Sequence, residues 1–241
     1  MVLGGGIAAA AQRILGKVAA ASGAGVSAPA FAPGTERLTS SRDDKAGFVR
    51  TGPTGGKRLA LTFDDGPTPG VTELILDELK RRKLHATFFM IGERIAAAPD
   101  LARRVVAEGH EVGNHTFTHP KLTTLADDLV DAEIQKTQDL MLDRLGHTAR
   151  WFRPPYGALR PSQARIPAAK GLRVALWSVD SKDWSQPGTD EIVRVVLAEA
   201  KPGAIILCHD LHRQTADSVG AILDGLVNRG WAFDTLSTLV K

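Results

Sequence analysis

Short apolar runs typical of β-strands alternate along the chain with longer stretches of helical periodicity. Seven strand-like runs follow residue 57, at 58–63, 86–91, 111–114, 151–153, 172–179, 204–208 and 231–233. Such alternation predicts parallel strands connected by crossover helices. Because no glycine-rich nucleotide loop interrupts it, the pattern favours one α/β barrel of strand–helix units over an open doubly wound sheet.

Between these runs, apolar residues recur at the spacing of an amphipathic helix. Leu74, Ile75 and Leu79 mark one helical face. Gly109 and Gly146 stand where two further helices should end. Additional helices are expected from about residue 190 and over 216–228, so most strand-to-strand connections have a helix available.

The composition is that of an ordinary soluble globular protein. The chain has 241 residues, of which 43% are hydrophobic and 24% are charged, and its formal net charge of +3 is spread along the sequence. No basic stripe with interleaved aromatic residues is visible, so nucleic acid is not an expected partner. Cys208 is the single cysteine, which excludes a disulfide within the chain. No apolar run reaches the roughly 18 residues that predict a transmembrane span. Separately, we expect the protein to be a monomer.

Residues 1–45 differ from the rest of the chain because Ala, Gly, Ser and Pro are abundant in them. Small residues around Ala28-Pro29-Ala30 resemble the cleavage region of a secretion signal. Against this interpretation, the segment lacks a basic start, and Gln12, Arg13 and Lys17 interrupt its apolar part. A signal remnant and a flexible linker both stay open, and we place the folded domain at 46–241.

Polar residues gather where the predicted strands end. Asp64 and Asp65 come at the end of the first run. The later strand ends carry His115, His119, Arg153, Asp180, Asp183, Trp184 and His209. In a parallel barrel all strand C-termini lie on one face, where active sites form. Each group alone could be an ordinary turn, cap or exposed helix face, but groups at five matched strand ends favour one shared site.

The first of these groups implies a cation. Gly66 and Pro67 cannot continue the strand, so the chain must turn and both carboxylates can face one site. Two adjacent carboxylates repel each other unless a cation or a proton lies between them. The spacing of His115 and His119 would place both rings on one side of a helical turn. One aspartate and two histidines make an open metal site that suits zinc, and also cobalt, nickel or iron.

The remaining polar residues suit acid–base chemistry around a metal, which lowers the pKa of its bound water towards neutrality. The second aspartate is free to act as a general base, and Arg153 is placed to keep it ionised. His209 is placed to give a proton to a leaving group. A neighbouring aspartate would keep that imidazole protonated; the strand order favours Asp180, with Asp183 as the alternative.

Together these residues carry a resemblance to a known family. In order along the chain, five segments resemble the motifs of the polysaccharide deacetylases of the NodB-homology type, carbohydrate esterase family four. The segments are Thr62–Pro67, His115–His119, Arg153–Tyr156, Asp180–Trp184 and Leu207–His209. The resemblance extends from about Lys57 to Lys241. It implies a distorted (β/α)7 barrel and metal-dependent removal of N- or O-acetyl groups from glycans.

The resemblance also implies the roles of the charged residues. The metal ligands would be Asp65, His115 and His119. The metal would be divalent, with zinc as the first choice and cobalt or nickel as alternatives. Asp64 would be the base, oriented by Arg153, and His209 would be the acid, oriented by Asp180.

Further residues are implied to contact the substrate. The backbone N–H of Tyr156 would help to stabilise the oxyanion. Trp184 and Leu207 would line a pocket for the acetyl methyl group, with Asp183 beside it. Because neighbouring strand residues point to opposite faces, Cys208 should point away from the rim.

The leading functional hypothesis is hydrolysis of the acetamide of N-acetylglucosamine units in peptidoglycan, chitin or chitooligosaccharides. An O-acetyl xylan esterase with the same five motifs is an alternative, and a catalytically silent glycan-binding module is another. A basic protein that binds nucleic acid or teichoic-type polymers is disfavoured by the dispersed charge. Since cell-wall and extracellular glycans lie outside the membrane, we expect an extracytoplasmic location. The other histidines, His85, His110, His147 and His212, show no partner pattern.

Overall fold

The computed structural model describes residues 47–241, so the expectations for residues 1–45 lie outside the described residues. The strands are β1 (Phe48–Val49), β2 (Arg58–Asp64), β3 (Thr87–Met90), β4 (Glu111–Asn114), β5 (Trp151–Phe152), β6 (Arg173–Ala175), β7 (Val179–Asp180), β8 (Ile205–His209) and β9 (Ala232–Asp234). They form one sheet in the order β1-β6-β5-β4-β3-β2-β8-β7, and β9 pairs with β2. All ladders between these strands are parallel, as the alternating pattern predicts.

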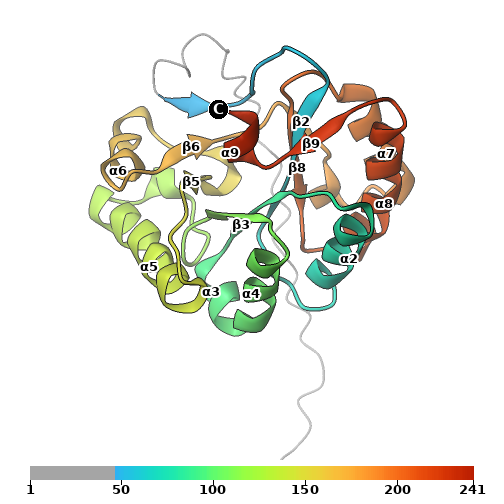
Figure 1. Cartoon of the computed structure of the whole chain (residues 1–241). Helices are drawn as coiled ribbons and strands as arrows, with labels where there is room; N and C mark the ends of the chain where they lie inside the picture. The colour runs from blue at the N-terminus through green and yellow to red at the C-terminus, as the bar shows by residue number, and fades with distance from the viewer. Residues whose placement is uncertain (1–46) are drawn as a thin grey trace, which may run out of the picture. The chain divides into compact units, whose positions relative to one another are not determined.

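The helices of the described region are α2 (Thr72–Arg82), α3 (Gly92–Ala97), α4 (Pro99–Ala107), α5 (Asp127–Leu145), α6 (Arg165–Ala169), α7 (Thr189–Glu199), α8 (Arg213–Val227) and α9 (Leu236–Leu239). Helices α2, α5, α7 and α8 lie around the outside of the strands (Figure 1). Gly146 ends α5 in the left-handed conformation, with φ of 78°, and Gly109 follows α4 with φ of 84°. Both are the helix ends that the sequence predicts. Within residues 47–241, no helix is both long enough and apolar enough to cross a membrane.

Strand β2 is the centre of the sheet, because it pairs with β3, β8 and β9. Its residues are buried from Leu59 to Asp64, as expected for a parallel strand that is covered on both faces. Leu59, Leu61 and Phe63 pack into the core that the outer helices share. Ala60 belongs to a separate inner cluster, so successive side chains alternate between the two layers.

The predicted strand at 172–179 is wrong in one respect, because it is two short strands with different neighbours. Strand β6 pairs with β5 and β1, whereas β7 pairs with β8 near the other end of the strand order. The chain passes from one to the other through residues 176–178. These few residues can span at most about 14 Å, so the sheet must curl until its two ends approach each other. The two-residue strand β1 is too short to give a periodic signal and was not predicted.

Leu176 and Ser178 complete this connection with backbone hydrogen bonds. Leu176 N–H donates to the Val49 carbonyl at 2.8 Å, and Ser178 N–H donates to the Ile205 carbonyl at 3.0 Å. The expected distorted (β/α)7 barrel is therefore confirmed, and residues 176–178 bridge its two sides. The ends of β2, β4, β5, β7 and β8 lie at one rim, where the sequence places its polar residues.

Candidate active site

The first site residues lie where β2 ends. Asp64 is the last strand residue, and Asp65 adopts a left-handed φ of 76°. This abrupt turn breaks the alternation of a strand, so both carboxylates face the rim. Asp65 N–H donates to the Phe89 carbonyl on β3 at 3.2 Å, which fixes the turn against the neighbouring strand.

The histidine segment follows β4, but it is not the helical turn that the four-residue spacing predicts. Thr116 has φ of 67° and His119 has φ of 61°, and no helix forms between them. Instead, the Asn114 side-chain oxygen accepts a hydrogen bond from Thr116 N–H at 2.9 Å. The two rings converge because the chain turns through left-handed residues, with ring centroids 5.0 Å apart.

These two segments bring Asp65, His115 and His119 together. Asp65 Oδ1 lies 3.3 Å from His115 Nε2 and 3.2 Å from His119 Nε2. Among residues 47–241, these three side chains form a group whose ligand atoms all lie within 4.8 Å of one another. Zinc ligands at about 2.0–2.1 Å in tetrahedral geometry would be about 3.3 Å apart. The two distances from Asp65 Oδ1 therefore fit a zinc ion or one of similar size.

The hydrogen bonds around the cluster also leave room for a cation. His115 Nδ1 lies 2.6 Å from the Arg153 carbonyl, so that nitrogen is the donor and Nε2 faces Asp65. Asp65 Oδ1 is buried and accepts no well-aligned hydrogen bond from the described residues. Burial opposes ionisation of Asp65, but the two imidazoles outweigh it and hold its pKa well below the usual range. A buried, ionised oxygen without a donor is what a metal ion satisfies.

Asp64 lies beside the cluster and is held by Arg153. Arg153 Nη1 donates to Asp64 Oδ1 at 2.6 Å and to Thr62 Oγ1 at 2.8 Å. The other guanidinium nitrogens donate to the carbonyls of Ala175 and Leu176 at 3.2 and 3.1 Å. Because Arg153 is fully buried and bonded at every nitrogen, it fixes the Asp64 carboxylate in one orientation.

His209 is paired with Asp183 and not with Asp180, which corrects the prediction from strand order. His209 Nδ1 lies 2.7 Å from Asp183 Oδ1, and His209 N–H donates to Asp183 Oδ2 at 2.7 Å. Asp180 instead accepts a hydrogen bond from Lys182 N–H at 2.9 Å. Lys182 has a left-handed φ of 58°, so the chain folds back and directs Asp183 to the imidazole. Asp180 stays at the strand end.

The pairing with Asp183 changes the protonation of His209. Burial alone would lower the pKa of the imidazole, but the Asp183 carboxylate outweighs burial and, with Asp65 and Asp64, raises that pKa to about 9. Thr215 Oγ1 also donates to Asp183 at 2.8 Å. The ring is therefore a stable imidazolium near neutral pH, and its Nε2 proton is available to another group.

The other predicted site residues also lie at this rim. Leu207 on β8 is buried, whereas Trp184 is 38% exposed and Tyr156 is 57% exposed. The Tyr156 ring packs edge-on against the His119 ring, with centroids 4.8 Å apart. Cys208 is buried in the core shared with the outer helices, so it points away from the rim as expected.

Two residues near the site were missed by sequence reasoning. Glu133 on α5 accepts hydrogen bonds from Phe117 N–H and Thr118 N–H at 2.9 and 2.8 Å. Thr62 donates to the Ile206 carbonyl at 2.6 Å while accepting from Arg153. Thr62 stands in the first motif, but nothing in the sequence links a helix residue such as Glu133 to the histidine segment.

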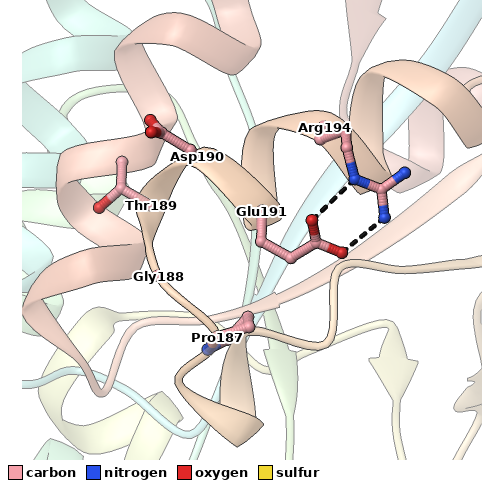
Figure 2. Close-up of a pocket in the computed structure, with 6 residues that line it drawn as sticks. All are labelled: Pro187, Gly188, Thr189, Asp190, Glu191 and Arg194. Atoms are coloured by element: carbon pink, nitrogen blue, oxygen red, sulfur yellow. Dashed lines mark hydrogen bonds and ion pairs between the residues drawn. The ribbon is translucent and has the colours of Figure 1, made fainter.

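One cavity borders the rim, and another borders the start of α7. One, of about 280 Å³, is lined by Asp65, Ile91, Glu93, Arg94, Thr118, His119 and Leu211. The other, of about 450 Å³, lies where α7 begins, and Figure 2 shows the Glu191–Arg194 ion pair on its wall. Only the smaller cavity includes residues of the metal-ligand cluster.

Comparison with known proteins agrees with the motifs. A sequence profile of the family described as polysaccharide deacetylase matches residues 51–175. The peptidoglycan-N-acetylglucosamine deacetylase PgdA of Listeria monocytogenes is 42% identical over 183 residues, which cover 76% of this chain and 39% of that protein. The chitooligosaccharide deacetylase of Rhizobium leguminosarum bv. trifolii is 40% identical over 194 residues, which cover 75% of this chain and 90% of that protein.

The fold is similar to that of solved deacetylases. The crystal structure of the Bc1960 peptidoglycan N-acetylglucosamine deacetylase superposes with a TM-score of 0.80 at 34% identity, covering 83% of this chain and 95% of that one. The chain spans about two fifths of the length of the Listeria relative and most of the Rhizobium one. Profile, sequences and fold point the same way: the chain belongs to the polysaccharide deacetylase family, the NodB-homology group of carbohydrate esterase family four.

Proposed function

We propose that this protein is a metal-dependent hydrolase that removes N-acetyl groups from N-acetylglucosamine units of peptidoglycan, chitin or chitooligosaccharides. One observation carries the proposal. The Asp65–His115–His119 cluster lies at a rim that also holds a fixed carboxylate, Asp64, and a fixed imidazolium, His209. The activities named for the Listeria and Rhizobium relatives support an N-acetylated glycan as the substrate. Because such glycans lie outside the membrane, we also propose an extracytoplasmic place of work.

Asp65, His115 and His119 would hold the divalent cation, with zinc as the first choice and cobalt or nickel as alternatives. A cation bound there supplies Lewis-acid chemistry, because it polarises a carbonyl oxygen and lowers the pKa of a bound water. The protein fixes the ligands through the Arg153 carbonyl at His115 Nδ1. That contact sets the tautomer in which His115 Nε2 is free to bind.

Asp64 is the general base in this proposal. Its Oδ1 is bonded to Arg153, and its Oδ2 lies 3.8 Å from His115 Nε2, so the second oxygen faces the ligand cluster. There it can take a proton from the water that attacks the acetamide carbonyl. Arg153 is buried and bonded to Asp64 Oδ1, so the carboxylate keeps the orientation in which Oδ2 faces the cluster.

His209 is the general acid. With Nδ1 bonded to Asp183, its Nε2 proton is the one that can move. It protonates the amide nitrogen as the carbon–nitrogen bond breaks, which releases acetate and leaves an amine on the sugar. The Tyr156 backbone N–H would stabilise the oxyanion, and Trp184 and Leu207 would enclose the acetyl methyl group.

Replacement of the proposed base tests this function. Asp64→Asn should lower kcat for acetate release from chitopentaose by about a thousandfold or more, because acid–base catalysis is typically worth about 10²–10⁴-fold. Zinc affinity, measured by isothermal titration calorimetry, should stay within about threefold of the parent because the three ligands remain. Chelation should stop the parent enzyme, and added zinc or cobalt should restore it.

A comparison of substrates distinguishes the proposed N-deacetylase from an O-acetyl xylan esterase. Chitopentaose, N-acetylated peptidoglycan fragments and acetylated xylan should be compared by mass spectrometry with metal-loaded enzyme. Acetate released only from the xylan would replace the amidase proposal with an esterase. Parent-like turnover by Asp64→Asn would remove the assignment of the base.

A further inference from the structure

The cavity beside the metal-ligand cluster offers space for a part of the substrate other than the acetyl group. Its volume is about 280 Å³, and its lining includes the cluster residues Asp65 and His119. The proposed acetyl-pocket residues Trp184 and Leu207 do not line it. A glycan bound with its acetamide at the cluster would therefore place a neighbouring substituent in this cavity.

Arg94 is the cationic residue of this cavity. It lies on α3 and is half-buried, and its Nη1 donates to Thr68 Oγ1 at 2.9 Å. Within residues 47–241 it forms no ion pair with a carboxylate, whereas Arg82 and Arg104 each bind two. A guanidinium has five N–H donors, so most of the hydrogen-bonding capacity of Arg94 is available to a ligand.

None of the carboxylates near this cavity forms an ion pair with Arg94 in the described residues. Asp65 faces the two imidazoles. Asp210, buried after β8, accepts a hydrogen bond from Thr72 Oγ1 at 2.6 Å. Glu93 also lines the cavity, but it is exposed and forms no ion pair with its neighbour Arg94 in the described residues. No carboxylate of residues 47–241 therefore forms an ion pair with Arg94, and the Arg94 charge acts on Asp210 only without direct contact.

We propose that Arg94 forms a subsite for a carboxylate carried by the glycan next to the sugar that is deacetylated. The inference rests on the proposed function and makes it more specific. A guanidinium binds a carboxylate through two parallel N–H···O hydrogen bonds, which gives orientation as well as affinity. Glycans that contain N-acetylmuramic acid carry such a group on the lactyl ether, whereas chitooligosaccharides are neutral. Arg94 thus favours peptidoglycan-type substrates over chitin-type ones.

The test compares one anionic and one neutral substrate of equal length. The probes are a tetrasaccharide of alternating N-acetylglucosamine and N-acetylmuramic acid with free lactyl carboxylates, and chitotetraose. Arg94→Gln should lower the ratio of kcat/KM for the anionic over the neutral substrate by about tenfold, the range expected for a hydrogen bond to a charged group. Arg94→Lys keeps the charge without the planar fork and should lower the ratio less.

Glu93 provides a matched control with the opposite charge in the same cavity. Glu93→Gln removes a repulsion for the anionic substrate, so it should raise the same ratio by about twofold. A ratio that Arg94→Gln leaves unchanged would overturn the proposal. Equal losses on both substrates would also overturn it, because they would indicate a structural role through Thr68.

Binding separates this inference from the proposed function. Isothermal titration calorimetry of both tetrasaccharides should show about tenfold weaker binding of the anionic one to Arg94→Gln, with a smaller change for chitotetraose. If the parent enzyme released acetate from neither substrate, the proposed function would fail, and these affinities would still decide the subsite. Equal affinity of Arg94→Gln and the parent for the anionic tetrasaccharide would overturn the subsite alone.

Discussion

Asp183 binds both the ring and the backbone N–H of His209, one with each oxygen. A carboxylate that is held in this way cannot rotate without losing two hydrogen bonds. Burial would raise the pKa of Asp183, but its contacts with His209 and Thr215 outweigh burial and lower that pKa. At the scale of single residues, the charge of Asp183 is therefore what keeps the proposed acid protonated.

This pair predicts the alkaline limit of activity. As the pKa of His209 is raised to about 9, the imidazolium persists below that pH and is lost above it, so kcat should fall above about pH 9. Asp183→Asn removes the charge, and the limit should move down by about two pH units towards the ordinary histidine value of about 6.5. The measurement is kcat against pH from 5 to 10 with saturating metal.

Asp180→Asn is the control for this profile. Asp180 bonds to Lys182 N–H and not to His209, so its replacement should leave the alkaline limit within about half a pH unit of the parent. A limit that follows Asp180 instead of Asp183 would contradict the pairing.

At the scale of elements, α5 supports the segment that carries both histidines. Both oxygens of Glu133 are used: Oε2 accepts from two backbone N–H groups, and Oε1 accepts from the Thr118 hydroxyl at 2.9 Å. Asn114 Nδ2 donates to the Ile134 carbonyl on the same helix at 2.9 Å. The helix thus holds the histidine segment at both of its ends.

Glu133→Gln should therefore weaken metal binding. The amide cannot accept at both positions, so the segment loosens and the zinc dissociation constant should rise by about tenfold, as is typical for outer-shell partners of metal ligands. Competition with a chromophoric chelator measures this constant directly. Asp139→Asn on the same helix is the control, because Asp139 accepts a hydrogen bond only from Gln135 among the described side chains. Parent-like zinc affinity in Glu133→Gln would contradict the supporting role.

The elements also show where sequence reasoning succeeds. The strands around β2 could be predicted because burial on both faces leaves continuous apolar runs, and the glycines after α4 and α5 mark true helix ends. The aspartate pair and the two histidines of the candidate metal site could be located because each follows a strand end, and the family resemblance implied that Asp65 is the ligand. These signals depend on composition and position, which the sequence shows directly.

The errors at the candidate site arise at residues with left-handed backbone conformations. Apart from Lys83, which ends α2, the non-glycine residues with positive φ in the described region lie at the rim. They are Asp65, Thr116, His119, Tyr156, Lys182 and Gln186. Such conformations are uncommon outside glycine, so neither the fold-back to Asp183 nor the non-helical histidine segment could be predicted. Strained residues of this kind gather at functional sites.

At the scale of the whole molecule, a buried histidine far from the rim makes stability depend on pH. His110 is 6% exposed, and its Nδ1 accepts a hydrogen bond from Ala86 N–H at 3.2 Å. Burial is the main cause that lowers the pKa of His110 to about 4. The unfolded chain binds the proton near pH 6.5 and the folded chain near pH 4, so this residue contributes stability above pH 6.5 that is lost as the pH falls between those values.

Urea unfolding at pH 7 and pH 5 measures this contribution. His110 should account for a decrease of about 2 kcal/mol in the free energy of unfolding between the two values. In His110→Asn, which keeps an acceptor near Ala86 N–H, that decrease should be smaller by about this amount. His147→Asn, at an exposed position, should keep the parent slope. An identical slope in His110→Asn and the parent would show that His110 does not titrate in this range.

The three residues that join β6 to β7 have a consequence for how the length of this chain can vary. The carbonyls of Ala175, the last residue of β6, and Leu176, the first residue of the connection, accept hydrogen bonds from Arg153, and Arg153 Nη1 donates to Asp64. An insertion in this connection would open the barrel and release Asp64, the proposed base, in one step. The proposed catalytic geometry therefore requires that the connection from β6 to β7 keeps its length.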